Sequence, residues 1–215
     1  VSAPLKDCSG NFIAGTDTLK IGLPEKPGVQ DVVVNEVMFN PAPNGSRYVE
    51  FYNRSQKVFD WSEFFIANNS GSTSTMQVKQ RKLALPGQYE VFAPNPLDVQ
   101  ERFDNVVERN VVEQPLPSLD DKAGNLTLYW SKNGQTVVLD SFDYSEDLHN
   151  GLFNIAEREG VALERIRTSA PTNDRANWTS ASPLLTGAVG SPTLPNSQRL
   201  GAAPATGDDL VSLLS

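Results

Sequence analysis

The sequence predicts an all-β fold, either a β-sandwich or a barrel. Apolar, β-branched and aromatic residues gather in short runs, and turn residues separate these runs. Gly and Pro each occur 15 times in 215 residues, a composition that favours many short strands over long helices. The pattern predicts roughly ten strands and no long helix.

Residues 1–30 are expected to be an appendage to this fold. Short strands are predicted at residues 12–13 and 19–23, and a linker rich in Pro and Gly follows at residues 24–28. We expect residues 1–23 to be either the last piece of a preceding domain or a strand laid on this one.

Two strands joined by a polar turn form the centre of the prediction. Residues 31–39 include four apolar residues in their first seven, which indicates a strand buried on most sides. Residues 40–47 are polar and form the turn, and residues 48–52 alternate between two faces. Residues 57–67 continue the β character.

The next part of the chain is predicted to form two strands and an irregular stretch. A strand is expected at residues 76–85, a turn at 85–88 and another strand at 88–93. Residues 94–118 mix valines with charges and lack a 3.6-residue spacing, so they fit either one helical turn or two short edge strands.

A β-hairpin is predicted around the Asn-Gly pair at residues 133–134. Its strands are residues 126–130 and 137–144, and Asn-Gly is the usual sequence of a two-residue hairpin turn. A loop with a short helix is expected at residues 145–160, and a strand at 161–166.

The last part of the chain is expected to wrap the body without regular structure up to Arg199. Trp178 lies at the centre of that stretch, and residues 200–215 are interpreted as a linker to a following domain. Glu164 and Arg165 lie in the strand expected at 161–166. They are predicted to form an ion pair across strands, which would contribute at most about 1 kcal/mol of stability if exposed.

Composition argues against several functional classes. The net charge of −8 and the pI near 4.7 disfavour nucleic-acid binding, because an acidic surface repels phosphate backbones. The densest basic patch, Lys79, Arg81 and Lys82, is interpreted as a solvated edge strand. Cys8 is the single cysteine, so no intrachain disulfide forms, and no apolar run reaches the 18 residues of a membrane span.

The stretch 31–55 resembles the opening of a lamin tail domain. That family has an apolar strand ending in Asn-Glu, followed by a strand of the type I-E-L-Y-N. The matching residues are Asn35, Glu36, Val37, Glu50, Phe51, Tyr52 and Asn53. The segments LPGQYEVF at 85–92 and NLTLYWSKNGQTVVLDSFDY at 125–144 resemble later parts of the same pattern. The resemblance implies an immunoglobulin-like β-sandwich with long irregular loops.

The C-terminal part resembles lamin tail domains of large bacterial surface proteins. A Leu-Glu-Arg strand is followed by Asn-Trp at 177–178 and by PNSQ at 195–198. The resemblance implies a lamin tail domain at 31–199, preceded at 1–30 by the end of an immunoglobulin-like module and a linker. It also implies an exported protein at the cell surface, in the periplasm or outside the cell. Its partner would be a protein or polysaccharide of unknown identity, or neighbouring domains of the parent chain.

Few residues suit catalysis or metal binding. Nucleophilic triads need a His base, and His149 is the single His; one Cys and one His also fall short of a zinc site. Carboxylates on or near strands could hydrolyse glycosides as a pair, or bind calcium. The calcium alternative centres on the loop with Asp120, Asp121 and Asn125. We favour structural roles for the carboxylates, no catalytic residue and no cofactor.

The sequence therefore leaves three hypotheses in order. The first is a non-catalytic interaction, adhesion or spacer module, the second a carbohydrate-binding module attached to a hydrolase, and the third a hydrolase in its own right. The second depends on exposure of Trp61, Phe65 or Trp130, since exposed aromatic side chains can stack on sugars. Structural roles are expected for the following residues of the family pattern: Asn35, Glu36, Glu50, Asn53, Asp140, Glu164 and Trp178.

Overall fold

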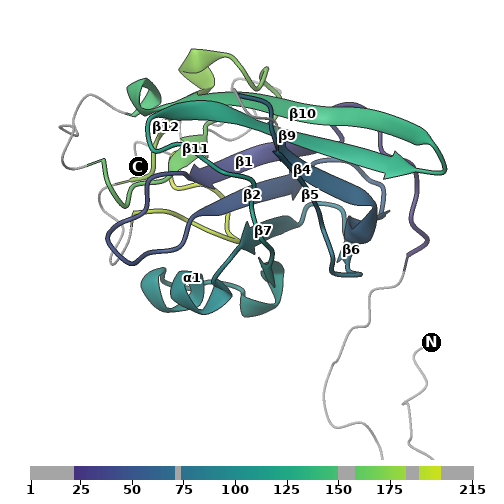
Figure 1. Cartoon of the computed structure of the whole chain (residues 1–215), viewed down its shortest axis with the longest axis horizontal. Helices are drawn as coiled ribbons and strands as arrows, with labels where there is room; N and C mark the ends of the chain where they lie inside the picture. The colour runs from purple at the N-terminus through teal and green to yellow at the C-terminus, as the bar shows by residue number, and fades with distance from the viewer. Residues whose placement is uncertain (1–21, 71–73, 150–157, 183–188, 200–215) are drawn as a thin grey trace, which may run out of the picture.

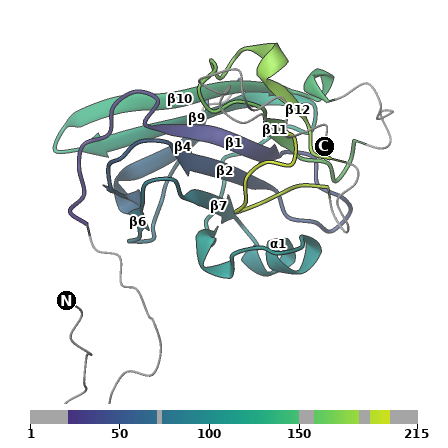
Figure 2. The same ribbon diagram turned by 180° about the vertical axis from the view of Figure 1, so that it is seen from behind.

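Two β-sheets packed face to face form the body of the protein (Figures 1 and 2). The structure is a computed structural model that describes residues 22–70, 74–149, 158–182 and 189–199. The six-stranded sheet has the order β12-β11-β1-β2-β7-β8, and the four-stranded sheet the order β10-β9-β4-β5. The sheets do not close into a barrel, so the prediction of an all-β sandwich is confirmed.

The six-stranded sheet is antiparallel except where β7 and β8 run parallel. Its strands are β1 (Val32–Met38), β2 (Tyr48–Asn53), β7 (Tyr89–Ala93), β8 (Val111–Glu113), β11 (Leu163–Arg165) and β12 (Trp178–Ser180). The strands of the four-stranded sheet are β4 (Phe64–Asn68), β5 (Ser74–Gln77), β9 (Ala123–Lys132) and β10 (Gln135–Ser145). A small separate sheet pairs β3 (Phe59–Asp60) with β6 (Leu83–Ala84).

Short helices connect the strands. The α-helix α1 (Pro96–Arg102) begins after Asn95, whose side chain accepts a bond from the Asp98 N–H. Single 3-10 turns are η1 (Trp61–Glu63), η2 (Glu108–Asn110), η3 (Glu146–Leu148) and η5 (Arg175–Asn177). Within the described residues, no helix is long and apolar enough to cross a membrane.

Local sequence signals predicted some elements better than others. The hairpin of β9 and β10 turns at Asn133 and Gly134, which both have positive φ as the Asn-Gly signal requires. Residues 94–118 contain both a helix, α1, and a short strand, β8. The single strand predicted at 76–85 is wrong, because the chain leaves β5 at buried Val78 and pairs again only at β6. The predictions for residues 1–21 and 200–215 lie outside the described residues.

The main core fills the space between the sheets. Large aromatic side chains dominate it: Phe51 lies 5.8 Å from Phe92 between ring centroids, and Phe142 stacks on Trp178 at 3.7 Å. The described part of the 167–199 stretch includes β12, so it has more regular structure than predicted.

The two outer faces of the sandwich are covered differently. Across the six-stranded sheet run α1 and residues 189–199, here called the closing segment, which is yellow in Figure 2. A second apolar cluster forms beneath them, with Met38 and Tyr48 from the sheet against Val99 and Phe103. The four-stranded sheet, which faces the viewer in Figure 1, has no described element packed over it in this way.

Candidate functional site

Three glutamates form a row across the outer side of the six-stranded sheet. Glu36 on β1 is in register with Glu50 on β2 and with Glu164 on β11. All three side chains are fully buried. The sheet register therefore places three carboxylates on adjacent strands, an arrangement that needs matched hydrogen-bond donors to be stable.

The closing segment supplies those donors. The Ser191 backbone N–H bonds Glu36 Oε1 at 3.0 Å, and the Ser191 hydroxyl donates to Glu164 Oε1 at 2.6 Å. The Thr193 N–H bonds Glu50 Oε2 at 2.5 Å. These bonds tie the closing segment to three strands, and therefore the row acts as an anchor for it.

Further donors complete the row at both ends. Glu164 Oε2 accepts from the Ser197 hydroxyl at 2.7 Å and from the Gln198 N–H at 3.0 Å. Glu36 also accepts from the Tyr48 hydroxyl. Glu50 Oε1 accepts from the Asn35 side-chain amide at 2.7 Å. Every carboxyl oxygen in the row thus has a hydrogen-bond partner from the chain itself, with Ser191 Oγ 3.2 Å from Glu36 Oε2.

Burial changes the protonation of this row. Desolvation, followed by repulsion from Glu164, raises the pKa of Glu36 to about 8. Burial and then the charge of Glu36 raise the pKa of Glu50 well above 4.5. Protonated Glu36 can donate from Oε2 to Ser191 Oγ, 3.2 Å away, while that hydroxyl donates onward to Glu164. Protonated Glu36 and the Ser191 hydroxyl would therefore form a chain of two hydrogen bonds that ends at Glu164.

Asp140 forms a second buried polar centre, on the inner side of the sheets. Its Oδ2 accepts from the Val34 N–H at 2.8 Å and from Arg165 at 3.3 Å. Its Oδ1 accepts from Thr172 at 2.5 Å and from Gln30 at 2.6 Å. Asp140 therefore connects strands of both sheets to two loops.

The predicted pairing of Glu164 with Arg165 across strands is wrong. Successive residues of a strand point to opposite faces, so Glu164 faces the closing segment while Arg165 faces the interior. Arg165 instead bonds Asp140 and the Val34 carbonyl, 2.9 Å away, and lies 5.9 Å from the ring of Trp178.

The other family-pattern residues also bond within the chain. Asn35 lies at a register shift in β1, where Asn196 of the closing segment donates to its carbonyl at 3.0 Å. Asn53 donates to the carbonyls of Lys57 and Ala84 and so fixes the turn after β2. The Trp178 indole N–H bonds the Thr172 carbonyl at 2.6 Å. Each contact joins segments far apart or shapes a turn, as a structural role requires.

His149 is buried beside Ser180. Its Nδ1 lies 3.0 Å from Ser180 Oγ, and its Nε2 has no hydrogen-bond partner among the described residues. Burial, assisted by the charge of Arg158, lowers the pKa of His149 to about 4, so the ring is neutral at pH 7. A Ser–His pair can supply a nucleophile and its base, but neither residue lines any of the three cavities described below.

The residues of the calcium hypothesis point to different partners. Asp120 accepts from the Lys122 N–H at 2.9 Å, while Asp121 forms an ion pair with Arg47. Asn125 donates to Asp143 at 2.7 Å from the sheet face. In the described part of the chain, no group of three His, Cys, Asp or Glu residues is arranged to hold a metal ion.

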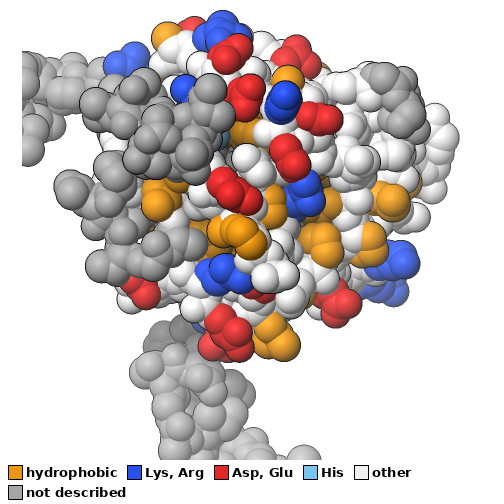
Figure 3. Space-filling view, turned by 60° about the vertical axis from the view of Figure 1, so that its left-hand side comes forward, with side chains coloured by type: hydrophobic (Ala, Val, Ile, Leu, Met, Phe, Trp, Pro, Cys, Tyr) orange, Lys and Arg blue, Asp and Glu red, His pale blue; other side chains and the backbone are white. Residues whose placement is uncertain are grey.

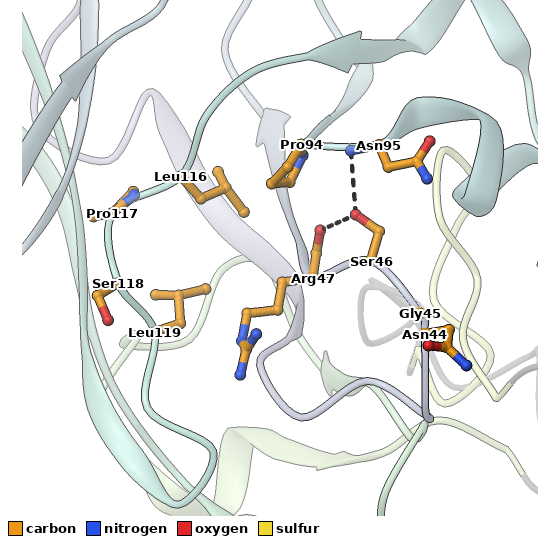
Figure 4. A pocket seen from close by; sticks show the side chains of 10 residues that line it. All are labelled: Asn44, Gly45, Ser46, Arg47, Pro94, Asn95, Leu116, Pro117, Ser118 and Leu119. Carbon is orange, nitrogen blue, oxygen red and sulfur yellow. Dashed lines mark hydrogen bonds between the residues drawn. The ribbon is translucent and has the colours of Figure 1, made fainter.

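A cavity of about 490 Å³ lies between the turn before β2, the start of α1 and the loop before β9 (Figure 4). Leu116, Leu119 and Pro94 provide apolar walls, and Arg47 points into the same space. The Ser46 hydroxyl accepts from the Asn95 N–H at 3.3 Å. No carboxylate is among the described residues that line this cavity, so they do not provide the pair that a glycosidase needs.

Two further cavities lie at other edges of the sandwich. One of about 480 Å³ includes Asp140 as the only carboxylate among its described lining residues. The other, of about 280 Å³, is lined by Glu25, Glu63 and Trp130. Glu63 already accepts from the Trp130 indole at 2.8 Å and from Lys132 at 2.5 Å. Sequence reasoning did not name Glu25 or Glu63.

The three aromatic residues of the sugar-binding hypothesis lie in different environments. Trp61 is 1% exposed and Trp130 is 4% exposed, and both belong to the main core. Phe65 is partly exposed and pairs across strands with Tyr129, which is also partly exposed. Of the three residues in the sugar-binding hypothesis, Phe65 is therefore the one in a partly exposed aromatic pair. Its neighbour Tyr129 was not part of that hypothesis.

The face of the molecule drawn in Figure 3 carries mixed charges. This view turns the left-hand side of Figure 1 forward, and acidic and basic side chains are interspersed there with small hydrophobic patches. The face therefore lacks the continuous basic patch with which proteins usually hold phosphate backbones.

Comparison of the sequence with models of known protein families gave no match, and comparison with curated proteins gave none either.

Proposed function

We propose that this chain is a non-catalytic, immunoglobulin-like module of the lamin-tail type, which acts as an interaction, adhesion or spacer unit of an exported bacterial surface protein. One observation carries the proposal: the carboxylates at the family-pattern positions are engaged inside the fold. Glu36, Glu50 and Glu164 hold the closing segment, and Asp140 holds Arg165. The resemblance of residues 31–198 to lamin tail domains supplies the fold type, the domain limits and the location.

A hydrolase is the alternative that needs a separate test. Its best location is the cavity with Glu25 and Glu63, because two carboxylates line it. The protein would be incubated with chromogenic glycosides, esters and phosphate esters, and product release measured. We expect none above the rate of the buffer; turnover that Glu63→Gln removes, while the Tm stays unchanged, contradicts the proposal.

Partner class is tested by thermal unfolding with added Ca²⁺, EDTA, polysaccharides and DNA. A ligand at 100 times its Kd adds about 2.7 kcal/mol, which raises the Tm of a domain this size by roughly 5–10 °C. We expect no change with EDTA or DNA. A lower Tm in EDTA would instead show that a bound divalent cation stabilises the fold, and would reopen the calcium hypothesis for the Asp120 loop. Export is tested by locating the parent protein in cell fractions.

A further inference from the structure

A row of exposed and partly exposed side chains crosses the outer face of the four-stranded sheet. The register aligns Gln77 on β5 with Phe65 on β4, Phe65 with Tyr129 on β9, and Tyr129 with Val138 on β10. Val138 is 47% exposed, and Phe65 and Tyr129 are partly exposed. Their sequence neighbours Phe64, Ile66, Leu128 and Trp130 belong to the core, so this row faces away from it.

A hydrogen-bonded ladder of uncharged side chains lies beside this row. Asn69 donates to the Tyr129 hydroxyl at 2.8 Å and to Thr127 Oγ1 at 3.0 Å. Thr127 donates to Asn125 Oδ1 at 2.6 Å, and Asn125 donates to Ser141 Oγ at 3.0 Å. These bonds fix the amides and hydroxyls before any ligand arrives, which lowers the entropy lost on binding.

The face is nearly free of charge on an acidic molecule. Among the described side chains of the row and ladder, the one charged group is Asp143 at the end, which accepts from Asn125 at 2.7 Å. The chain as a whole carries a net charge of −8. A neutral ligand matches this face, whereas an anionic ligand is repelled by the molecule and a cationic one finds little to bind here.

We propose that this face, the outer side of the four-stranded sheet in Figure 1, binds a neutral polysaccharide, with Tyr129 and Phe65 against the sugar rings. The side-chain amides of Asn69 and Asn125, which are exposed and partly exposed, would bond the sugar hydroxyls, while buried Thr127 holds them in place. Aromatic rings offer apolar area with little conformational freedom to lose, and sugar rings present C–H groups between their hydroxyls. A protein partner of an acidic molecule is usually steered by complementary charge, which this face lacks. The inference rests on the proposed function, since it names the ligand class of a non-catalytic binding module.

The test is native gel electrophoresis of the whole chain through gels containing soluble β-glucan, mannan, dextran or xylan, with alginate as the anionic probe. We expect at least one neutral polymer to retard the protein and alginate to have no effect. Tyr129→Ala should weaken the retardation about tenfold, by loss of the aromatic contact. Val138→Ser, an exposed change that spares the core, should weaken it severalfold. Tyr52→Ala, in an aromatic pair on the opposite sheet, is the matched control and should bind normally.

Three outcomes overturn the inference. The first is no retardation by any neutral polymer, the second retardation by alginate alone, and the third binding that survives both Tyr129→Ala and Val138→Ser. Sedimentation checks a further occupant: a dimer that Tyr129→Ala dissociates would assign the face to a second copy of the chain. Release of reducing sugar from a bound polymer would contradict the proposed function instead, so the two failures are distinguishable.

Discussion

The two outer faces of the sandwich present polar side chains in cross-strand rows, yet only one of these rows consists of buried carboxyl groups. On the six-stranded sheet, the row of Glu36, Glu50 and Glu164 lies beneath the closing segment. On the four-stranded sheet, the row through Phe65 and Tyr129 is open and uncharged. Carboxylates tolerate burial where a later segment brings N–H and O–H donors to them, and without such a segment the face is built from amides, hydroxyls and aromatic rings.

The largest effect is expected from a change in the glutamate row beneath the closing segment. Glu164→Ala leaves Ser191, Ser197 and the Gln198 N–H without their acceptor, and should lower the free energy of unfolding by about 3 kcal/mol. The Tm should fall by roughly 6–12 °C. Asp143→Ala on the open face is the control and should cost less than about 1 kcal/mol. Equal losses from the two changes would erase the distinction between the faces.

The second prediction concerns pH. Because the pKa of Glu36 is about 8 in the folded state and 4.5 when exposed, its protonation stabilises the fold fully below about pH 4.5. That contribution is lost as pH rises toward 8, at no more than about 1.4 kcal/mol per pH unit. Between pH 5.5 and 8, the free energy of unfolding of Glu36→Gln, measured with urea, should therefore fall by about 2 kcal/mol less than that of the parent protein. Parallel pH profiles for the two proteins would contradict a protonated Glu36.

The third prediction concerns the closing segment, whose backbone at Gly190 lies close to side chains of the sheet. A Cβ at Gly190 would lie 2.6 Å from the Tyr48 hydroxyl and 2.8 Å from Glu36 Oε1. Gly190→Ala should therefore destabilise the protein by about 1–3 kcal/mol and speed protease cleavage within the closing segment. Gly28→Ala is the matched control, since its Cβ would meet nothing closer than 3.5 Å. Unchanged stability in Gly190→Ala would mean that the segment lies farther from the sheet.

The smallest effect belongs to the open face. Asn69→Ala removes two bonds to Thr127 and Tyr129 at an exposed position, where water can replace them. The free energy of unfolding should change by less than about 0.5 kcal/mol, as measured by urea titration. A loss above about 2 kcal/mol would make the ladder a structural feature and remove the reason to treat it as a ligand surface.

Sequence patterns predicted what depends on near neighbours. The Asn-Gly turn fixed the hairpin of β9 and β10, and alternation placed Tyr48, Glu50 and Tyr52 on one face. The break after β5 was missed, because it depends on Gln114, which bonds the Lys79 N–H from a distant loop.

The buried row was only half predictable. A structural role for Glu36, Glu50 and Glu164 followed from their place in the family pattern. Their burial did not, because the donors come from the closing segment, more than 140 residues after Glu36 and Glu50 and 27 or more residues after Glu164. Likewise, the exposed aromatic pair of Tyr129 and Phe65 could not be predicted, because the local sequence does not determine which residues pair between strands.

The closing segment also determines how the protein would respond to being pulled from its two ends. Bonds from Asn196 to Asn35 and from Ser191 to Glu36 join the start of the sandwich to its end across 155 or more residues. A force applied between residues 31 and 199 would therefore act first on these few bonds, and not on the rest of the sandwich. While these bonds remain intact, the sandwich transmits the force at nearly constant length. Once these bonds break, the residues between them can extend to roughly 500 Å, so the sandwich would lengthen under load instead of transmitting it.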